Sequence, residues 1–187
     1  MSDKNQRLVF DGNMDELVEV LEREIAITKS DESKPVLGAY GLGPCVLLAG
    51  YEPDKNIAFM LYSNGLTNVS SSFGILLYYL SKTANGQKST YDVRLIGGKK
   101  RGSESTISLL KSRLNVRDDI QMNLVEEDTL GYQAGDKGKT LALDSRTGET
   151  YHYDFRKNPN ARQVSLEQFE FMNSLGVQPA SVIYKPE

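Results

Sequence analysis

The chain has 187 residues, of which 39% are hydrophobic and 25% are charged, and its formal net charge at neutral pH is −3. This length and composition favour one domain, over residues 1–187, with a sizeable hydrophobic core. The small excess of acidic residues argues against nucleic acid as a partner and against anionic membranes, because both attract strongly basic surfaces.

The single cysteine of the chain excludes an internal disulfide, which fits a reducing compartment. No apolar segment near the N-terminus has the form of a secretory signal, and the apolar runs 46–49 and 75–80 are too short to cross a bilayer. We therefore expect a cytoplasmic protein, or an effector secreted without a Sec-type signal, and no membrane insertion.

Apolar residues at helical spacing predict a first helix between Asn13 and Lys29. Asn13 and Glu16 have the spacing of a capping box. The apolar positions that would share one face are Met14, Leu17, Leu21 and Ile25. A polar loop would follow this helix.

Two apolar segments, 45–51 and 57–62, are separated by a stretch centred on Pro53-Asp54. Proline followed by aspartate favours a turn, so the two segments are predicted to form a β-hairpin. The spacing of apolar residues over 69–80 predicts a second helix, which Asn85-Gly86 would end.

Alternating residues over 91–95 predict a strand that leads into Gly97-Gly98, and a third helix would follow Ser103 and extend to Leu114. The later predicted elements are strands over 120–125, 140–143 and 150–155, a fourth helix from Ser165 to Leu175 that Gly176 stops, and a strand over 181–184. Because helices and hairpins are mixed without a regular βαβ order, we expect the α+β class. The expected architecture is a layered α/β sandwich with a mixed or antiparallel sheet and flanking helices.

The most distinctive segment is Ala39-Tyr40-Gly41-Leu42-Gly43-Pro44-Cys45-Val46, in which glycines precede the single cysteine and an apolar strand follows it. Such a loop can present a nucleophile at the mouth of a sheet. A free cysteine is also commonly buried as a small hydrophobic residue, but the glycines favour a position at a pocket. To react, the thiol needs a base that forms the thiolate, because its ordinary pKa is about 8.5.

This segment resembles the nucleophile loop Thr-x-Gly-Leu-Gly-Ser-Cys-Val of the CheD family, the chemoreceptor glutamine deamidases of bacterial chemotaxis. Later segments resemble further motifs of the family in the same order, over 57–62, 95–98, 127–131 and 147–148. The resemblance covers about residues 35–153 and leaves 1–34 and 160–187 outside it. It implies a CheD-like fold and a hydrolase of protein glutamine amides, with Cys45 as the nucleophile.

The chain departs from the family at the catalytic positions. The resemblance implies a catalytic histidine at Ala58, or at Phe59 if the strand is shifted by one residue, and neither side chain can carry a proton. Ala39 replaces the family's threonine, and Pro44 replaces the serine before the cysteine. Loss of a member of such a unit costs on the order of a thousandfold in rate.

His152, the single histidine of the chain, is the remaining candidate base. It lies on the predicted strand 150–155, far from Cys45 in sequence, and a half-exposed strand histidine without a catalytic role is the simpler interpretation. We therefore expect no proton-transferring neighbour beside the thiol.

Two functions remain open. The first is a degenerate, non-catalytic relative of the deamidases, a pseudoenzyme that binds or regulates a protein, such as one with a glutamine-bearing helix. Its binding residues would be Gly41, Gly43, Pro44, Ala58, Phe59, Gly97 and Gly98. The second is an active protein glutamine deamidase or related amide hydrolase, of chemotaxis or toxin type, that uses Cys45. Neither function requires a cofactor or a metal ion, and the oligomeric state stays open.

The loop Gly97–Ser103 is basic and rich in glycine, and it joins a predicted strand to a predicted helix. Helix N-termini bind anions, but the loop lacks the P-loop pattern. A solvated loop is the simpler interpretation, and a docking patch for an acidic partner is the alternative. Tyr78 and Tyr79, and Phe171 outside the apolar stripe of the last helix, suggest further surfaces for a partner.

Overall fold

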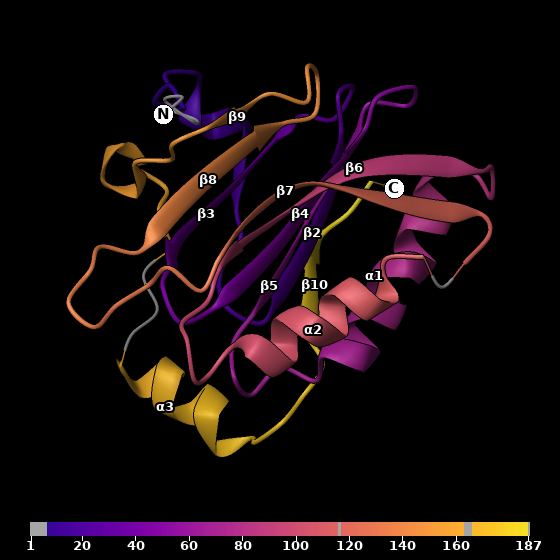
Figure 1. Cartoon of the computed structure of the whole chain (residues 1–187). Helices are drawn as coiled ribbons and strands as arrows, with labels where there is room; N and C mark the ends of the chain where they lie inside the picture. Colours follow the sequence, from indigo (N-terminus) through magenta and orange to yellow (C-terminus); the bar gives the residue numbers. More distant parts are fainter. Residues whose placement is uncertain (1–6, 116, 163–165, 187) are drawn as a thin grey trace, which may run out of the picture.

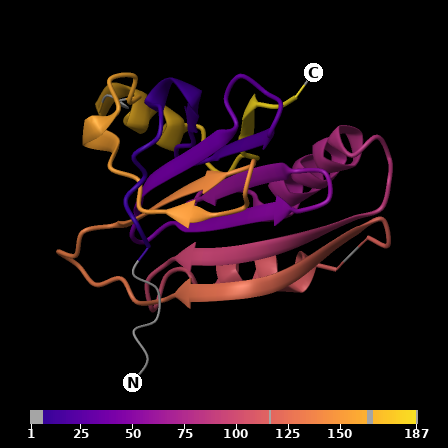
Figure 2. The same ribbon diagram turned by 90° about the horizontal axis from the view of Figure 1, so that it is seen from above.

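The structure, a computed structural model, describes residues 7–115, 117–162 and 166–186. It has three layers, which Figure 1 and Figure 2 show from two directions: a four-stranded sheet, a six-stranded sheet, and a layer of helices. The helices α1 (Val69–Thr83) and α2 (Glu104–Arg113) cover the face of the six-stranded sheet that is turned away from the smaller sheet.

The six-stranded sheet is mixed. In spatial order its strands are β10 (Ser181–Tyr184), β2 (Glu24–Lys29), β5 (Ile57–Ser63), β4 (Val46–Glu52), β6 (Ser89–Gly97) and β7 (Ile120–Thr129). The outer pairs, β10 with β2 and β6 with β7, are parallel, whereas the inner pairs are antiparallel. Strands β10 and β7 therefore form the two edges.

The four-stranded sheet consists, in spatial order, of β1 (Leu17–Glu19), β3 (Val36–Leu42), β8 (Lys139–Asp144) and β9 (Thr150–Tyr151). The remaining helical segments are the 3-10 helices η1 (Met14–Glu16) and η2 (Phe155–Lys157) and the helix α3 (Leu166–Ser174). Strands β3 and β4 belong to different sheets, so the chain crosses from one sheet to the other between them. Cys45 lies in this crossing segment.

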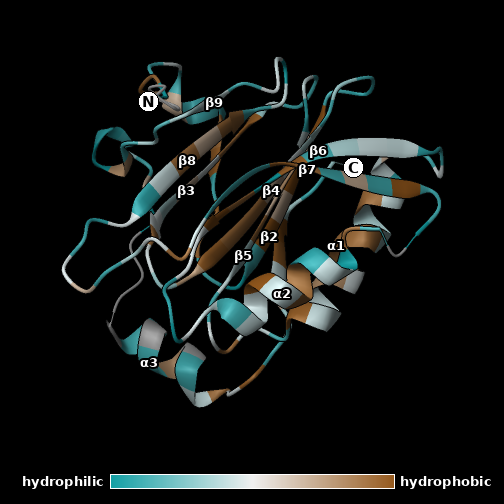
Figure 3. Ribbon diagram, in the orientation of Figure 1, coloured by the Kyte–Doolittle hydropathy of each residue, from teal (hydrophilic) through white to brown (hydrophobic). Residues whose placement is uncertain are grey.

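Two hydrophobic cores hold the layers together. One lies between the helices and the six-stranded sheet and includes Phe59 and Phe73, and the other lies between the two sheets and includes Met60 and Leu141. Because β5 has a core on each face, all of its residues are buried. The apolar character of β4 and β5 is visible as brown ribbon in the middle of Figure 3.

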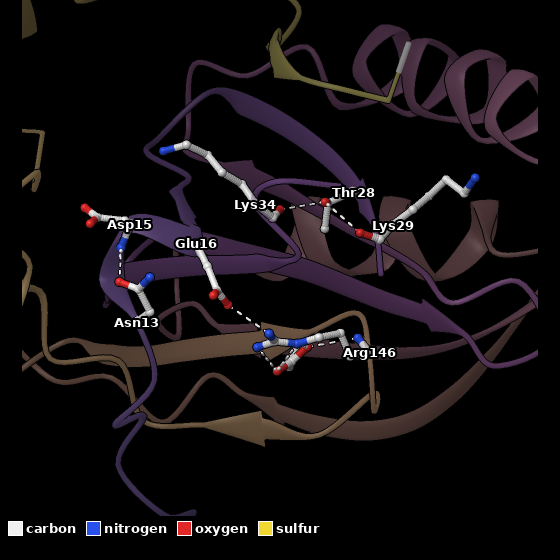
Figure 4. A network of polar contacts seen from close by, with 8 residues as sticks. Asn13, Asp15, Glu16, Thr28, Lys29, Lys34 and Arg146 are labelled. Carbon is white, nitrogen blue, oxygen red and sulfur yellow. Dashed lines mark hydrogen bonds and ion pairs between the residues drawn. The ribbon is translucent and has the colours of Figure 1, made fainter. Parts of the chain in front are cut away.

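The prediction of an N-terminal helix was wrong. Asn13 does cap a helical turn, since its side chain accepts a hydrogen bond from the Asp15 N–H over 3.0 Å, but that turn is only η1. Glu16 forms an ion pair with Arg146 across the small sheet instead of closing a capping box (Figure 4). Strands β1 and β2 follow, because the run Ile25-Ala26-Ile27 is buried at every residue, which suits a strand covered on both faces.

Most later elements agree with the predictions. The predicted hairpin is β4–β5, the second and third helices are α1 and α2, and the last strand is β10. Strand β7 is longer than predicted and ends at Thr129, whereas β9 ends at Tyr151 and Phe155 lies in η2. The fourth helix corresponds to α3, but its predicted cap, Ser165, lies outside the described residues. This mixture of helices with parallel and antiparallel strands is compatible with the α+β class.

None of the helices in the described ranges is long and apolar enough to cross a membrane.

A buried carboxylate, that of Glu19, ties β1 to the segment after β9. The Tyr153 hydroxyl donates to Glu19 Oε1 over 2.6 Å, and the Arg162 backbone N–H donates to Glu19 Oε2 over 2.6 Å. Asn158 Nδ2 in turn donates to the Tyr153 hydroxyl over 2.7 Å. Glu19 is only 5% exposed, so these donors replace the water that a carboxylate would otherwise bind.

We expect Tyr153→Phe to lower the free energy of unfolding by about 2 kcal/mol, because it removes a donor from a buried carboxylate and an acceptor from Asn158. Urea unfolding followed by circular dichroism measures the change. Tyr132→Phe removes a partly exposed hydroxyl and serves as the control, with an expected change below about 0.5 kcal/mol. Equal unfolding midpoints for wild type and Tyr153→Phe would contradict a net contribution from this network.

Candidate functional site

Cys45 lies between the two sheets, directly before β4. It is 6% exposed and belongs to the core between the sheets, so it is buried where the sequence favoured a pocket. Strand β3, which precedes it, is irregular at Gly41, whose φ of +72° is readily reached only by glycine. The Gly43 N–H then donates to the Gly41 carbonyl over 2.7 Å, which closes the turn before the cysteine.

The Gly97-Gly98 element holds this loop in place. The Gly98 N–H donates to the carbonyl oxygens of Gly43 and Cys45, each over 2.8 Å. The Ser103 hydroxyl donates to the Pro44 carbonyl over 2.7 Å. The structure therefore brings the predicted binding residues Gly41, Gly43, Pro44, Gly97 and Gly98 together around Cys45.

Ala58 and Phe59, the two positions that the resemblance assigns to a histidine, do not lie beside the thiol. In the hairpin Val46 pairs with Ser63, whereas Ala58 pairs with Tyr51. Five residues of strand separate those pairs, which corresponds to about 16 Å. Phe59 faces the helices and packs edge-on against Tyr91. The structure thus corrects the placement of both residues at the site.

The sequence analysis missed two polar side chains here: Glu22, which contacts the sulfur, and Asn64, which contacts Glu22. Glu22, in the connection between β1 and β2, has Oε1 at 3.2 Å from Cys45 Sγ. Asn64, directly after β5, donates from Nδ2 to Glu22 Oε2 over 3.0 Å. The Leu66 N–H donates to Asn64 Oδ1 over 2.9 Å, which turns the amide nitrogen toward Glu22. We expected no proton-transferring neighbour beside the thiol, and the structure places a carboxylate there.

This carboxylate does not activate the thiol in the way an imidazole would. Burial raises the pKa of the Cys45 thiol far above its ordinary range, and the negative charge of Glu22 and the hydrogen bond to it raise the pKa further. An imidazolium beside a cysteine lowers the thiol pKa, whereas a carboxylate disfavours a second negative charge. Cys45 is therefore a protonated hydrogen-bond donor at neutral pH.

Tyr62 fills the same core beside the thiol. It is 2% exposed, and its hydroxyl donates to the Tyr40 carbonyl over 2.9 Å. Burial raises the pKa of Tyr62 well above its usual value, so the phenol is also neutral. The hydroxyl thus donates to the backbone of β3, and Cys45 shares its core with apolar side chains such as Leu42, Leu47 and Ile96.

His152 is not part of this site. Its side chain is exposed, and its backbone exchanges hydrogen bonds with Leu8 and Phe10 at the margin of the four-stranded sheet. No hydrogen bond joins it to Cys45 in the described ranges of the chain. The simpler interpretation, a strand histidine without a catalytic role, agrees with this position.

The basic loop before α2 does not present a free anion site. The Glu104 carboxylate accepts hydrogen bonds from the N–H groups of Arg101 and Gly102, over 2.5 and 2.8 Å. Both N–H groups belong to the loop ahead of the helix, whose N-cap is Ser103. An internal carboxylate therefore takes the place of an external anion.

No three or more histidine, cysteine, aspartate or glutamate side chains among the described residues are grouped so that they could hold a metal ion. The aromatic surface candidates are exposed: Tyr78 is 51% and Phe171 64% accessible to solvent.

One of the missed residues had a signal in the sequence. The hairpin register ends with Val46 opposite Ser63, and continuing it by one residue would put Asn64 opposite Cys45. A register counted outward from the turn at Pro53-Asp54 places Asn64 opposite the thiol. Glu22 has no such signal, since it reaches Cys45 only through the pairing of β2 with β5.

No protein-family model matches the chain, and a search of curated proteins finds no significant match either.

Proposed function

We propose that the protein is a non-catalytic relative of the CheD-type glutamine deamidases, and that it acts as a protein-binding, regulatory module. The observation that carries this proposal is the state of Cys45. Its buried, protonated thiol donates a hydrogen bond to Glu22 and has no imidazole beside it among the described residues. The glycine loop and the Gly97-Gly98 element, which the proposed relationship assigns to the surroundings of a nucleophile, lie around Cys45, and its thiol is protonated.

The chemistry of amide hydrolysis explains why this state matters. A cysteine deamidase needs a thiolate to attack the glutamine amide and a general acid to protonate the leaving ammonia. A carboxylate has an ordinary pKa of about 4, so proton transfer to it from a thiol is strongly unfavourable. Burial of Cys45 also limits access for a side-chain amide.

The resemblance of sequence motifs supports the relationship to deamidases. The motif loop before Cys45 and the Gly97-Gly98 element are far apart in the chain, yet they contact each other directly. A hairpin follows Cys45, and a helix and a strand then lead back to Gly97-Gly98, as the motif order implies.

An assay of ammonia release tests the proposal. The protein is incubated with unfolded casein and with short glutamine peptides, and ammonia is measured by a coupled enzymatic assay. We expect no release above that of the Cys45→Ser variant. Release by the wild type that Cys45→Ser abolishes would overturn the proposal.

The contact between Cys45 and Glu22 favours one second candidate, an active amide hydrolase that uses this pair. If substrate binding excluded water and brought a cation near the sulfur, the carboxylate over 3.2 Å would be the nearest proton acceptor. In that case ammonia release would be lost in Glu22→Gln as well as in Cys45→Ser. Release that survives Glu22→Gln would exclude this mechanism.

A further inference from the structure

A groove runs along one edge of the six-stranded sheet, between helix α1 and strand β10. It has a volume of about 630 Å³ and lies on the helix side of the sheet, away from the core that contains Cys45. Its lining residues are Ser71, Gly74, Ile75, Tyr78 and Tyr79 of α1, together with Ala180 and Val182. The helix positions recur at intervals of three and four residues, so they form one stripe along α1.

Strand β10 offers an unpaired edge to this groove. Among the described residues it is the last strand of the sheet and pairs only with β2, in a register that is regular over Ser181 and Val182 and shifts between Val182 and Tyr184. The Ser181 N–H donates to the Arg23 carbonyl over 2.9 Å, so in a parallel ladder the N–H and C=O of the next residue, Val182, point to the open side. An open strand edge is a template for a further strand.

The charge around the groove is positive. Lys82 Nζ lies 4.9 Å from the centre of the Tyr78 ring, and Lys185 Nζ lies 5.5 Å from the centre of the Tyr79 ring. Both lysines are exposed, and no carboxylate in the described part of the chain forms an ion pair with either. None of the described residues that line the groove is acidic. A partner whose surface complements the positive charges of Lys82 and Lys185 would carry carboxylate side chains.

Gly74 leaves room in the groove. It lies in the interior of α1, where glycine is unfavourable relative to alanine, and a Cβ built there would meet nothing within 4 Å. Packing within the chain therefore does not require glycine at this position. The space above it accepts a side chain from outside.

We propose that this groove binds an extended acidic peptide segment of a partner protein, which adds a strand to β10. Backbone hydrogen bonds to Val182 provide the register. The side chains of the added strand that face α1 are apolar beside Tyr78 and Gly74 and acidic near Lys82 and Lys185, whereas the side chains between them point to the opposite face. The proposal rests on the protein-binding role proposed above and assigns that role to a surface separate from Cys45.

Fluorescence anisotropy with labelled octapeptides tests this mode of binding. The probe is an octapeptide that carries valine and aspartate at the positions facing α1 and threonine at the positions between them. The comparison peptides are the same octapeptide with lysine in place of aspartate and the acidic peptide N-methylated at every second amide. We expect saturable binding of the acidic peptide and at least about tenfold weaker binding of the other two, because one has the wrong charge and the other lacks the strand donors.

Variants of the full chain test the residues. Replacing Lys82 and Lys185 by glutamate together should reverse the preference between the acidic and basic peptides, whereas the matched variant Lys100→Glu/Lys137→Glu should bind as the wild type does. Gly74→Gln should weaken binding about tenfold without lowering the melting temperature, because glutamine is a better helix former than glycine. Lys100 and Lys137 are exposed, and they lie in the loops before α2 and before β8.

Absence of saturable binding of the acidic peptide would overturn the inference. Undiminished binding of the N-methylated peptide, or binding unchanged by the charge reversal at Lys82 and Lys185, would also overturn it. Tighter binding of a helical acidic peptide than of the extended one would exclude strand addition. The Cys45→Ser variant separates this result from the proposed function: it should bind the peptide as the wild type does, even if ammonia release shows the protein to be an enzyme.

Discussion

In its native state Cys45 should react with iodoacetamide at pH 7.5 at least about a hundredfold more slowly than in the urea-unfolded chain. Only the thiolate reacts, and each unit by which the pKa rises lowers the thiolate fraction tenfold. Burial is the largest cause of the raised pKa of Cys45, and the charge of Glu22 adds to it. Burial also shields the sulfur itself, which is part of a residue that is 6% exposed.

The variant Glu22→Gln separates the two causes. It removes the negative charge and keeps a hydrogen-bond acceptor, so the alkylation rate should rise roughly tenfold, the effect of about one pKa unit. The rate should stay below that of the unfolded chain, because burial remains. Glu170→Gln on the exposed surface of α3 is the matched control and should leave the rate unchanged. The measurement is the increase in intact mass with time, since the chain has a single cysteine.

Rapid labelling of the native protein at neutral pH would contradict this account of the thiol. It would mean that Cys45 is open and ionised, and it would favour the second candidate, the active hydrolase. A rate that is slow in both Glu22→Gln and the wild type would assign the effect to burial and would leave the proposed function unchanged.

Gly97→Ala should lower the free energy of unfolding by more than about 3 kcal/mol, one of the largest effects of any single methyl group in this chain. The residue has φ of +96°, which alanine avoids, and a Cβ there would lie 2.3 Å from the Cys45 carbonyl oxygen. That oxygen cannot retreat without breaking its hydrogen bond to the Gly98 N–H. Strain and a steric clash therefore act together.

Gly86→Ala provides a matched control. Gly86 has φ of +69°, but a Cβ at this position would meet nothing within 4 Å. Its expected cost is about 1 kcal/mol, from backbone conformation only. Urea unfolding measures both variants. If the two variants lost equal stability, the contact between Gly97 and the Cys45 loop would contribute nothing.

Gly97→Ala should also raise the alkylation rate of Cys45, because the Gly97-Gly98 element fixes the loop that carries the thiol. If Gly97→Ala lowered the free energy of unfolding but left the alkylation rate of Cys45 unchanged, the Gly97-Gly98 element would stabilise the fold without controlling access to the thiol. Measuring both the free energy of unfolding and the alkylation rate of Cys45 in this variant shows whether the Gly97-Gly98 element acts on the loop that carries the thiol.

Elements with a strong local pattern were predictable from the sequence. The β4–β5 hairpin follows from the turn residues Pro53-Asp54 between two apolar segments, and α1 follows from apolar residues at helical spacing over 69–80. Gly97-Gly98 was recognisable in the sequence as a glycine pair between a predicted strand and a predicted helix, and in the structure both glycines have positive φ. These features depend on interactions between residues that are close in sequence.

The N-terminal segment shows where this reasoning fails. The positions Met14, Leu17, Leu21 and Ile25 fit a helix, and Asn13 does cap a turn, yet the residues after Glu16 form two strands. Strand β1 pairs with β3, and β2 pairs with β5 and β10. The conformation of these two strands therefore depends on partners that are distant in the chain, since β10 follows β2 by about 150 residues. Local spacing carries no information about such partners.

The sequence by itself determined the hairpin after Cys45, the helices that cover the larger sheet, and the glycines that allow the loop at the thiol to form. Only the tertiary structure decided the state of the cysteine. Strand pairing brings the β1–β2 connection to the end of the hairpin, which places Glu22 against the sulfur. The physical reason is that a thiol's ionisation depends on burial and neighbouring charge, and both are created when distant segments pack together.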